Sequence, residues 1–537
     1  MSEKIRLFNS LTVLISAAML LAEGAAAAPV RIGVDDAGAE YPLHKVSWGA
    51  ALVKDLGIDT WVMHYFPSPV IGQNLSHIRE VDQFCEKSGL RWVANFENAN
   101  WIREFRDETG YDWYNREDGR HFELPPETVR ASLGAATRCD GVMYDEAEHM
   151  QNCTNAIANG AKLWKPYIYA PSGSLEGASD AFSAAVGDVA ALYRKDGVRL
   201  YTEHVFPVLC HGFAAGGFTA SVKILKESWA PVHLACGMGA ALQYGTEFWV
   251  TPDLWFLGNY PGHSAEEYRS ALLLAYHFGA DCIYTENLSY DNEKKGRGSL
   301  ILAGQEGYTL TEYGRVLRWF AREYVPAHPR THSFRDFQPR VAIIRQPDGC
   351  WGQGNSWLPD ALYGNSDWPS NEKTEAWFRI FHLLTRGVVP ADGLSWNGAG
   401  SYVNRPHGGF CPMDGVVVFD HKVDGARLAG VEAVFLTGLG VSPETLAAVE
   451  KAVLAGTVCF VQPHLAPGRV RDAVEKTGEL ADGAGRWVVA DDFLSPIVRK
   501  NVGRFCAERG AIRGRFAGQN VSFTFTEDDP NRLILSE

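Results

Sequence analysis

The sequence has little that suits a nucleic-acid or membrane partner. It contains 50 Lys and Arg against 64 Asp and Glu residues, so its formal net charge is -14 at pH 7. Binding a phosphate backbone needs a basic surface, and this balance argues against a nucleic-acid partner. Beyond the N-terminal leader, no segment approaches the roughly 18 uninterrupted apolar residues of a membrane span. We therefore expect no membrane association after the leader is removed.

Several catalytic and metal-binding motifs are also missing. The ten cysteines include no CxxC, and neither an HExxH nor a GxSxG motif occurs. These absences argue against a zinc site and a serine esterase, so we expect no metal and no cofactor. Cys236, Cys282 and Cys459 lie in apolar runs typical of buried thiols. Cys139 and Cys153 flank a predicted strand and are the first pair to test for a disulfide.

The N-terminus has the pattern of a signal peptide. Lys4 and Arg6 precede a mostly apolar run from Leu11 to Ala22, and small residues from Ala25 to Ala28 follow. We expect cleavage after residue 28 and a periplasmic or extracellular mature protein. An uncleaved membrane anchor is the alternative.

One stretch organises the rest of the chain. The apolar run Gly141–Tyr144 is typical of a central parallel strand, and it leads directly into Asp145 and Glu146. The runs ending in Glu203 and Glu286 have the same shape, and the run ending in Glu97 is a looser copy. In a parallel barrel such strand ends meet at one face.

The sequence from 29 to 330 alternates short apolar strands with helical patterns. We predict a (β/α)8 TIM barrel, an α/β fold, with an open doubly wound sheet as the alternative. The segment Phe218–Ser228, between the fifth and sixth predicted strands, has a helical pattern. The predicted strands are Val30–Val34, Thr60–Tyr65, Leu90–Phe96, Gly141–Tyr144, Val198–Glu203, Pro231–Cys236, Phe248–Thr251 and Cys282–Thr285.

A second α/β region follows a Pro-rich junction. The strand Val431–Leu436, a helix that starts at Ser442 and the strand Thr457–Val461 form a βαβ unit. We predict a flavodoxin-like domain over 336–500 and a C-terminal β hairpin segment over 501–537. The turn Thr437–Gly440 lacks the GxGxxG spacing, so nucleotide binding there is disfavoured.

Paired carboxylates at strand ends indicate glycoside hydrolysis. One carboxyl group donates a proton, while the other attacks the anomeric carbon or activates water. Glu203 and Glu286 are the favoured catalytic pair, with Asp145 and Glu146 as alternatives, and Asp253 follows the seventh strand. The strand positions favour a retaining pair about 5 Å apart. For each acid alone, a structural ion pair is the competing interpretation.

Aromatic and polar residues near these strand ends suit a sugar, whose C–H faces stack on aromatic planes. Trp61, Trp92 and Trp249 lie inside strands and are expected in the core. The predicted substrate-binding residues, besides Asp253, are Glu97, Trp101, Tyr144, His204, Trp255 and His64.

The layout resembles a known family. The run from Glu247 through Asp253 to Ser264, followed by Ala271–Phe278 and Cys282–Thr285, is similar to the last two barrel units of clan A glycosidases. A flavodoxin-like domain after the barrel resembles the trimerisation domain of family 42 β-galactosidases. The resemblance implies a carbohydrate substrate and association of copies through the second domain.

The catalytic motifs depart from that family. It places Asn-Glu after the fourth strand and a nucleophilic Glu after the seventh, whereas this chain has Asp145-Glu146 and Asp253 there. The Asp-Glu pair also resembles that of the hexosaminidases. Two other classes stay open. One is a non-catalytic carbohydrate-binding protein on a glycosidase-like barrel, and the other is a different enzyme such as a polysaccharide lyase or deacetylase.

Overall fold

The computed structural model describes residues 29–36, 41–65, 71–96, 125, 127–152, 172–225, 228–254, 263–289, 298–350, 362–365, 367–393, 409–474, 476–526 and 528–536. The predicted leader lies outside these ranges. Among the described residues no helix is both long and apolar enough to cross a bilayer.

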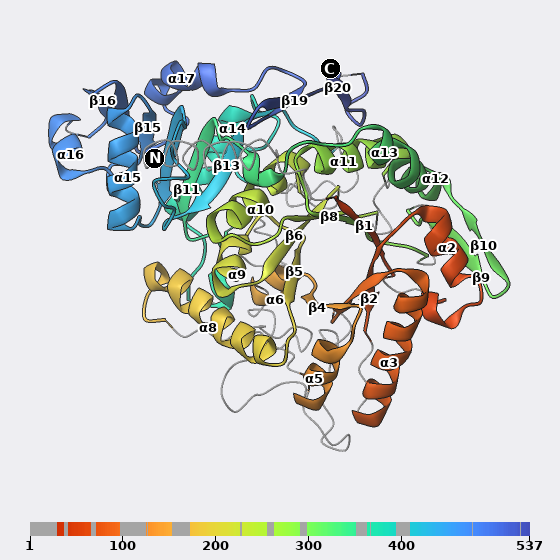
Figure 1. Ribbon diagram of the computed structural model, residues 1–537. Coiled ribbons are helices and arrows are strands. Elements are labelled where there is room, and N and C mark those ends of the chain that lie inside the picture. Colours follow the sequence, from red (N-terminus) through yellow and green to blue (C-terminus); the bar gives the residue numbers. More distant parts are fainter. Residues whose placement is uncertain are drawn as a thin grey trace, which may run out of the picture.

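The N-terminal part of the chain forms a closed barrel of parallel strands in the order β1 to β8 (Figure 1). The TIM barrel prediction is therefore confirmed, and the open sheet is excluded. The strands are β1 (Arg31–Asp35), β2 (Thr60–His64), β3 (Arg91–Asn95), β4 (Cys139–Tyr144), β5 (Leu200–His204), β6 (Thr219–Ile224), β7 (Trp249–Pro252) and β8 (Cys282–Thr285).

Helices cover the outside of the barrel. Their ends carry the expected caps: the Ser264 side chain accepts a hydrogen bond from Glu267 N at the start of α11, and the Ser174 side chain accepts one from Gly177 N at the start of α8. These helices are α2 (Gly49–Leu56, preceded by the 3-10 turn η1, Leu43–Lys45), α3 (Ile71–Ser88), α5 (Glu127–Ala135), α6 (Ala147–Asn152), α8 (Leu175–Lys195), α9 (Cys210–Gly216), α10 (Ala230–Tyr244) and α11 (Ala265–His277).

The sixth barrel unit differs from the prediction. The segment expected to be helical contains β6, and the predicted strand Pro231–Cys236 lies within α10. The reason is that α10 is buried on nearly every face, between the barrel and a second sheet, so it shows no polar stripe to mark it as a helix. The strand β6 contains one charged residue, Lys223, which interrupts an otherwise strand-like run. The Lys223 side chain points into the barrel.

The second sheet has six strands in the order β13-β11-β14-β15-β17-β16, with β16 antiparallel at one edge. The predicted βαβ unit is present as β14, α15 and β15. The flavodoxin-like assignment and the domain boundaries stay predictions. The elements are β11 (Val341–Gln346), α14 (Glu372–Leu384), β13 (Val416–Asp420), β14 (Ala433–Gly438), α15 (Pro443–Leu454), β15 (Val458–Val461), α16 (Gly468–Val474), β16 (Gly478–Asp482), β17 (Gly485–Val489) and α17 (Pro496–Val502).

The backbone of the turn after β14 is hydrogen-bonded to side chains of the same sheet region. Gly438 N donates to Gln462 Oε1, and Gly438 O is hydrogen-bonded by His464 Nε2. A Cβ at Gly438 would lie 1.9 Å from Gln346 O, and its φ is 97°. Glycine is therefore required here for close strand packing at a left-handed position.

Smaller elements connect and close the chain. Strands β18 and β19 form a hairpin, and β20 pairs with β19 antiparallel. The elements are β9 (Ile301–Gly304), β10 (Gly307–Leu310), α12 (Glu312–Trp319), η3 (Phe320–Tyr324), α13 (Val325–Ala327), η4 (Phe334–Asp336), η5 (Leu362–Gly364), β12 (Met413–Asp414), η6 (Gly503–Phe505), β18 (Ala511–Phe516), β19 (Gln519–Thr524) and β20 (Ile534–Ser536).

The barrel and the second sheet pack directly on each other. At Gly239 of α10 a Cβ would lie 1.7 Å from Val418 O of β13, so the helix backbone rests on that strand. Gln243 and Tyr244 at the end of α10 both donate hydrogen bonds to the Asp420 carboxylate. The apolar composition of α10 is explained by these two layers, one on each side of it.

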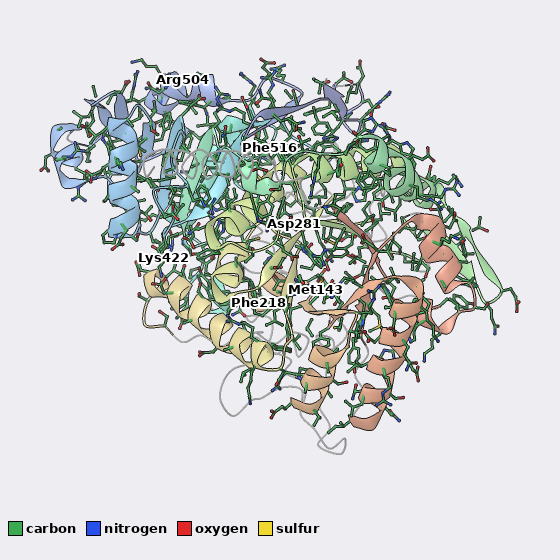
Figure 2. The ribbon with its side chains drawn as sticks, viewed as in Figure 1. Met143, Phe218, Asp281, Lys422, Arg504 and Phe516 are labelled. Carbon is green, nitrogen blue, oxygen red and sulfur yellow. The ribbon has the colours of Figure 1, made fainter. Side chains whose placement is uncertain are left out.

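The interior of the barrel is closed by an apolar layer and, below it, by ion pairs. Met143 lies inside this layer (Figure 2) together with Val62, Val93, Tyr201, Trp249, Cys282 and Tyr284. At the N-terminal strand ends the Asp140 carboxylate accepts from three guanidinium groups, those of Arg31, Arg91 and Arg199. Any site in the barrel must therefore open at the carboxyl ends of the strands.

The cysteines in the described ranges are free thiols. Cys236, Cys282 and Cys459 are buried as expected. Cys139 forms no disulfide within these ranges, and its predicted partner Cys153 lies outside them.

Candidate functional site

Above the apolar layer, every barrel strand contributes one inward polar residue at its carboxyl end. Each lies two positions after an interior residue, so the period of two along a strand directs both into the barrel. All eight are at most 6% exposed. We call this set the polar ring: Asp35, His64, Asn95, Asp145, Glu203, Lys223, Asp253 and Glu286.

The Lys223 ammonium group is the centre of this ring. Its Nζ lies 2.7 Å from Glu286 Oε2, 3.2 Å from Asp145 Oδ1 and 3.5 Å from Glu203 Oε1. Glu146 Oε1 and Asp253 Oδ2 are each 3.8 Å away. One buried cation thus joins the acids that follow the fourth, fifth, seventh and eighth strands.

The remaining ring members form a second connected group. His64 Nε2 lies 2.8 Å from Asp35 Oδ1, and Asn95 Nδ2 lies 3.0 Å from Asp145 Oδ2. Asn95 Nδ2 is also 3.4 Å from Asp35 Oδ2. Asn95 therefore links the Asp35–His64 pair to the carboxylates around Lys223.

Burial and neighbouring charges shift the pKa values of Lys223 and Glu203. Burial alone lowers the pKa of Lys223, but the carboxylates of Asp145, Glu203, Glu286 and Asp253 together raise it well above its usual value, so the amine stays charged. Burial raises the pKa of Glu203 well above its usual value, and Asp145 adds to this. Burial therefore favours the neutral form of Glu203, while the Lys223 ammonium opposes this.

Glu203 and Asp253 are the least exposed of the acids around Lys223. The Glu203 side chain is fully buried, and neither of its carboxyl oxygens has a hydrogen-bond partner within the described ranges. The side chains of Glu286 and Glu146 are 8% and 13% exposed, which makes these the acids closest to the mouth of the barrel. The arrangement places a fully buried acid with a raised pKa beside more accessible carboxyl groups.

A third acid lies beside the ring at the end of β1. Asp36 accepts a hydrogen bond from His64 N, and burial raises its pKa to about 7. His64 lowers this pKa while Asp35 raises it further.

Six of the predicted site residues come together here. They are Glu203, Glu286, Asp145, Glu146, Asp253 and His64. Sequence reasoning missed Asp35, Asn95 and Lys223. The first two follow the alternation of strands that had been correctly located, so extending that pattern by two positions finds them. Lys223 was missed because its strand was interpreted as a helix.

Two of the predicted substrate contacts, Tyr144 and His204, lie away from the polar ring. The Tyr144 hydroxyl is hydrogen-bonded to that of Tyr193 on α8, outside the barrel wall. His204 is fully buried between Thr202 Oγ1 and Val208 O. Both residues lie one position from an inward residue, and the strand alternation turns them outward. Glu97, Trp101 and Trp255 lie outside the described residues.

His204 belongs to a separate buried cluster with Glu148. Burial lowers the pKa of His204 to about 3, so the ring is neutral. Its Nδ1 lies 3.4 Å from Glu148 Oε2, and Val205 N and Phe206 N donate to Glu148 Oε1. Burial raises the pKa of Glu148 to about 8. This cluster holds the connection after β5 in place.

No protein-family model and no curated protein matches the chain. A catalytic mutant of a GH42 β-galactosidase from G. stearothermophilus is similar in structure, with a TM-score of 0.55 and 10% identity over 93% of each chain. The β-galactosidase from Rahnella sp. R3 has a TM-score of 0.53 and 10% identity over 92% of this chain and 93% of that one. The resemblance expected from the sequence is confirmed at the level of the fold.

Proposed function

We propose that the protein is a glycoside hydrolase that acts through two carboxyl groups of the polar ring by a retaining mechanism. The observation that carries this proposal is the unequal state of the acids around Lys223. Glu203 is fully buried and its pKa is raised well above its usual value, while Glu286 lies closest to the ammonium, at 2.7 Å. Acid–base pairs in enzymes arise where environments separate the pKa values of neighbouring groups.

In this proposal Glu203 donates the proton to the glycosidic oxygen. A carboxyl group kept protonated by burial suits a general acid. After the first step the same group, now ionised, takes a proton from the water that hydrolyses the glycosyl-enzyme.

Glu286 attacks the anomeric carbon. Its contact with the Lys223 ammonium favours a carboxylate at this position, and its partial exposure places it nearer the mouth than Glu203. Both groups contact one ammonium nitrogen, so they are close neighbours, as a retaining pair about 5 Å apart must be. Asp145, Glu146 and Asp253 are placed to accept hydrogen bonds from sugar hydroxyls.

Lys223 is not a base in this site. A lyase needs a neutral amine or a phenolate to remove a proton, and the carboxylates hold Lys223 in its charged form. That state disfavours the lyase alternative. A specific observation does favour the binding-protein alternative: the ammonium ties up the acids that hydrolysis would use.

The test is hydrolysis of a panel of aryl glycosides by the protein, Glu203→Gln, Glu286→Gln and the exposed control Glu86→Gln. We expect turnover of at least one glycoside, loss of about 10²-fold or more for each ring variant, and no change for the control. Glu203→Ala should retain more activity on substrates with highly acidic leaving groups, because these need no proton. Binding of a sugar without turnover by any form would establish the binding-protein function instead.

Two further proposals rest on sequence alone. Residues 1–28 direct export to the periplasm or the extracellular space. Copies of the chain associate through the region of the second sheet. The mass of the mature exported protein tests removal of residues 1–28. Its sedimentation behaviour tests whether copies associate.

A further inference from the structure

A group of potential metal ligands lies on the outside of the barrel, away from the polar ring. His44 belongs to η1, in the connection between β1 and α2, and His77 and Glu80 lie on α3. One ligand atom from each lies within 4.8 Å of the others. His77 and Glu80 are three residues apart on the helix, so their side chains share one face.

The two histidines are available as ligands. Both ring nitrogens of His44 are buried and have no hydrogen-bond partner in the described part of the chain. Native proteins pair nearly all such groups, so an unpaired buried imidazole calls for an explanation.

Packing holds the rings in place. The His44 ring lies 5.2 Å from that of His77 and 5.8 Å from that of Trp61, between centroids. The His77 ring also lies 5.4 Å from that of Tyr65. These contacts reduce the conformational entropy lost when the ligands converge on an ion.

We propose that His44, His77 and Glu80 bind one divalent transition-metal ion, with Zn²⁺ the best fit. Two imidazoles and one carboxylate suit zinc, which binds such ligands at about 2.0–2.2 Å and leaves a fourth position for water. Side-chain rotation closes the gap between the present separation and that geometry. The ion joins the β1–α2 connection to α3.

Lys45 is the competitor for this site. Its ammonium group is ion-paired with Glu80, and both side chains are about half exposed. Exposed pairs of this kind are weak, so an ion can displace the lysine from the carboxylate. Removing the lysine charge should strengthen metal binding, whereas it has no such effect if Glu80 is not a ligand.

The experiment is calorimetric titration of the metal-free, tag-free protein with Zn²⁺, together with visible absorption after Co²⁺ addition. The variants are His77→Ala, Glu80→Gln and Lys45→Met, with Glu86→Gln on the same helix as the matched control. We expect one equivalent of Zn²⁺ with a Kd below about 1 mM, at least tenfold weaker binding for His77→Ala and Glu80→Gln, and tighter binding for Lys45→Met. The control should match the parent protein.

Two outcomes overturn the proposal. One is the absence of saturable binding at millimolar Zn²⁺, and the other is binding that His77→Ala leaves unchanged. Because none of these residues contacts the polar ring, the result is independent of glycoside hydrolysis.

Discussion

Replacing Lys223 by methionine tests the electrostatic design of the polar ring. Methionine keeps a similar volume but removes the only cation within 4 Å of Asp145, Glu203 and Glu286 among the described residues. These carboxyl groups are at most 8% exposed, so water cannot replace the ammonium. The ring then holds several buried acids without the ammonium group that contacts them.

The expected loss of stability is large and depends on pH. Breaking a buried ion pair costs about 3–5 kcal/mol, and Lys223 serves several acids, so we expect about 5 kcal/mol at pH 8. Without the lysine the ring acids have raised pKa values in the folded state. The stability that these raised pKa values contribute is fully present below the pKa of the same acids in the unfolded chain. It is lost as pH rises through their pKa values in the folded state. Each pKa unit corresponds to about 1.4 kcal/mol, so the loss at pH 5 should be smaller by several kcal/mol.

Urea unfolding at pH 5 and pH 8 measures both values. Near-UV circular dichroism is a suitable signal because Trp249 and Tyr201 lie in the layer directly below the ring. Lys87→Met, an exposed residue of the last turn of α3, is the control and should unfold like the parent protein. The reasoning is refuted if Lys223→Met is as stable as the parent at pH 8, or if its loss is equal at both pH values.

Three other predictions concern the framework around the site. Glu148 has a pKa of about 8 against 4.5 in the unfolded chain, so its contribution to stability is lost as pH rises between these values. Glu148→Gln should flatten the dependence of urea unfolding on pH there, and an unchanged slope would contradict the argument. Gly239→Ala should lower Tm, because its Cβ would meet Val418 O at 1.7 Å and overpacking costs about 1–3 kcal/mol or more. Gly72→Ala on α3, with nothing within 4 Å, should not lower Tm. Asp140→Asn removes the carboxylate shared by Arg31, Arg91 and Arg199, and because Arg91 and Arg199 are 41% and 53% exposed it should destabilise the protein by about 1–3 kcal/mol, as measured by urea unfolding. An unchanged midpoint would show that the network contributes nothing.

Local patterns predicted seven of the eight barrel strands, because each is a short apolar run with an acid or a turn at its end. The same patterns failed at the sixth unit. A helix such as α10, buried on nearly all sides, has the composition of a buried strand, and the two differ only in what surrounds them. Because that strand was predicted as a helix, Lys223 at the centre of the ring was not predicted as a site residue.

The direction of each side chain explains the other differences between the predicted and the observed site residues. His64 and His204 both end barrel strands, yet His64 faces the ring and His204 faces the connection after β5. A one-residue change of register reverses the two faces of a strand, and the composition near a strand end does not show which face a residue takes. The sequence alone determined that acids gather at the carboxyl ends of a parallel barrel, since strand periodicity and the chain direction are local properties. Only the tertiary structure decided that Lys223 is their common partner and that burial raises the pKa of Glu203, because charge and burial depend on groups brought together from strands far apart in the chain.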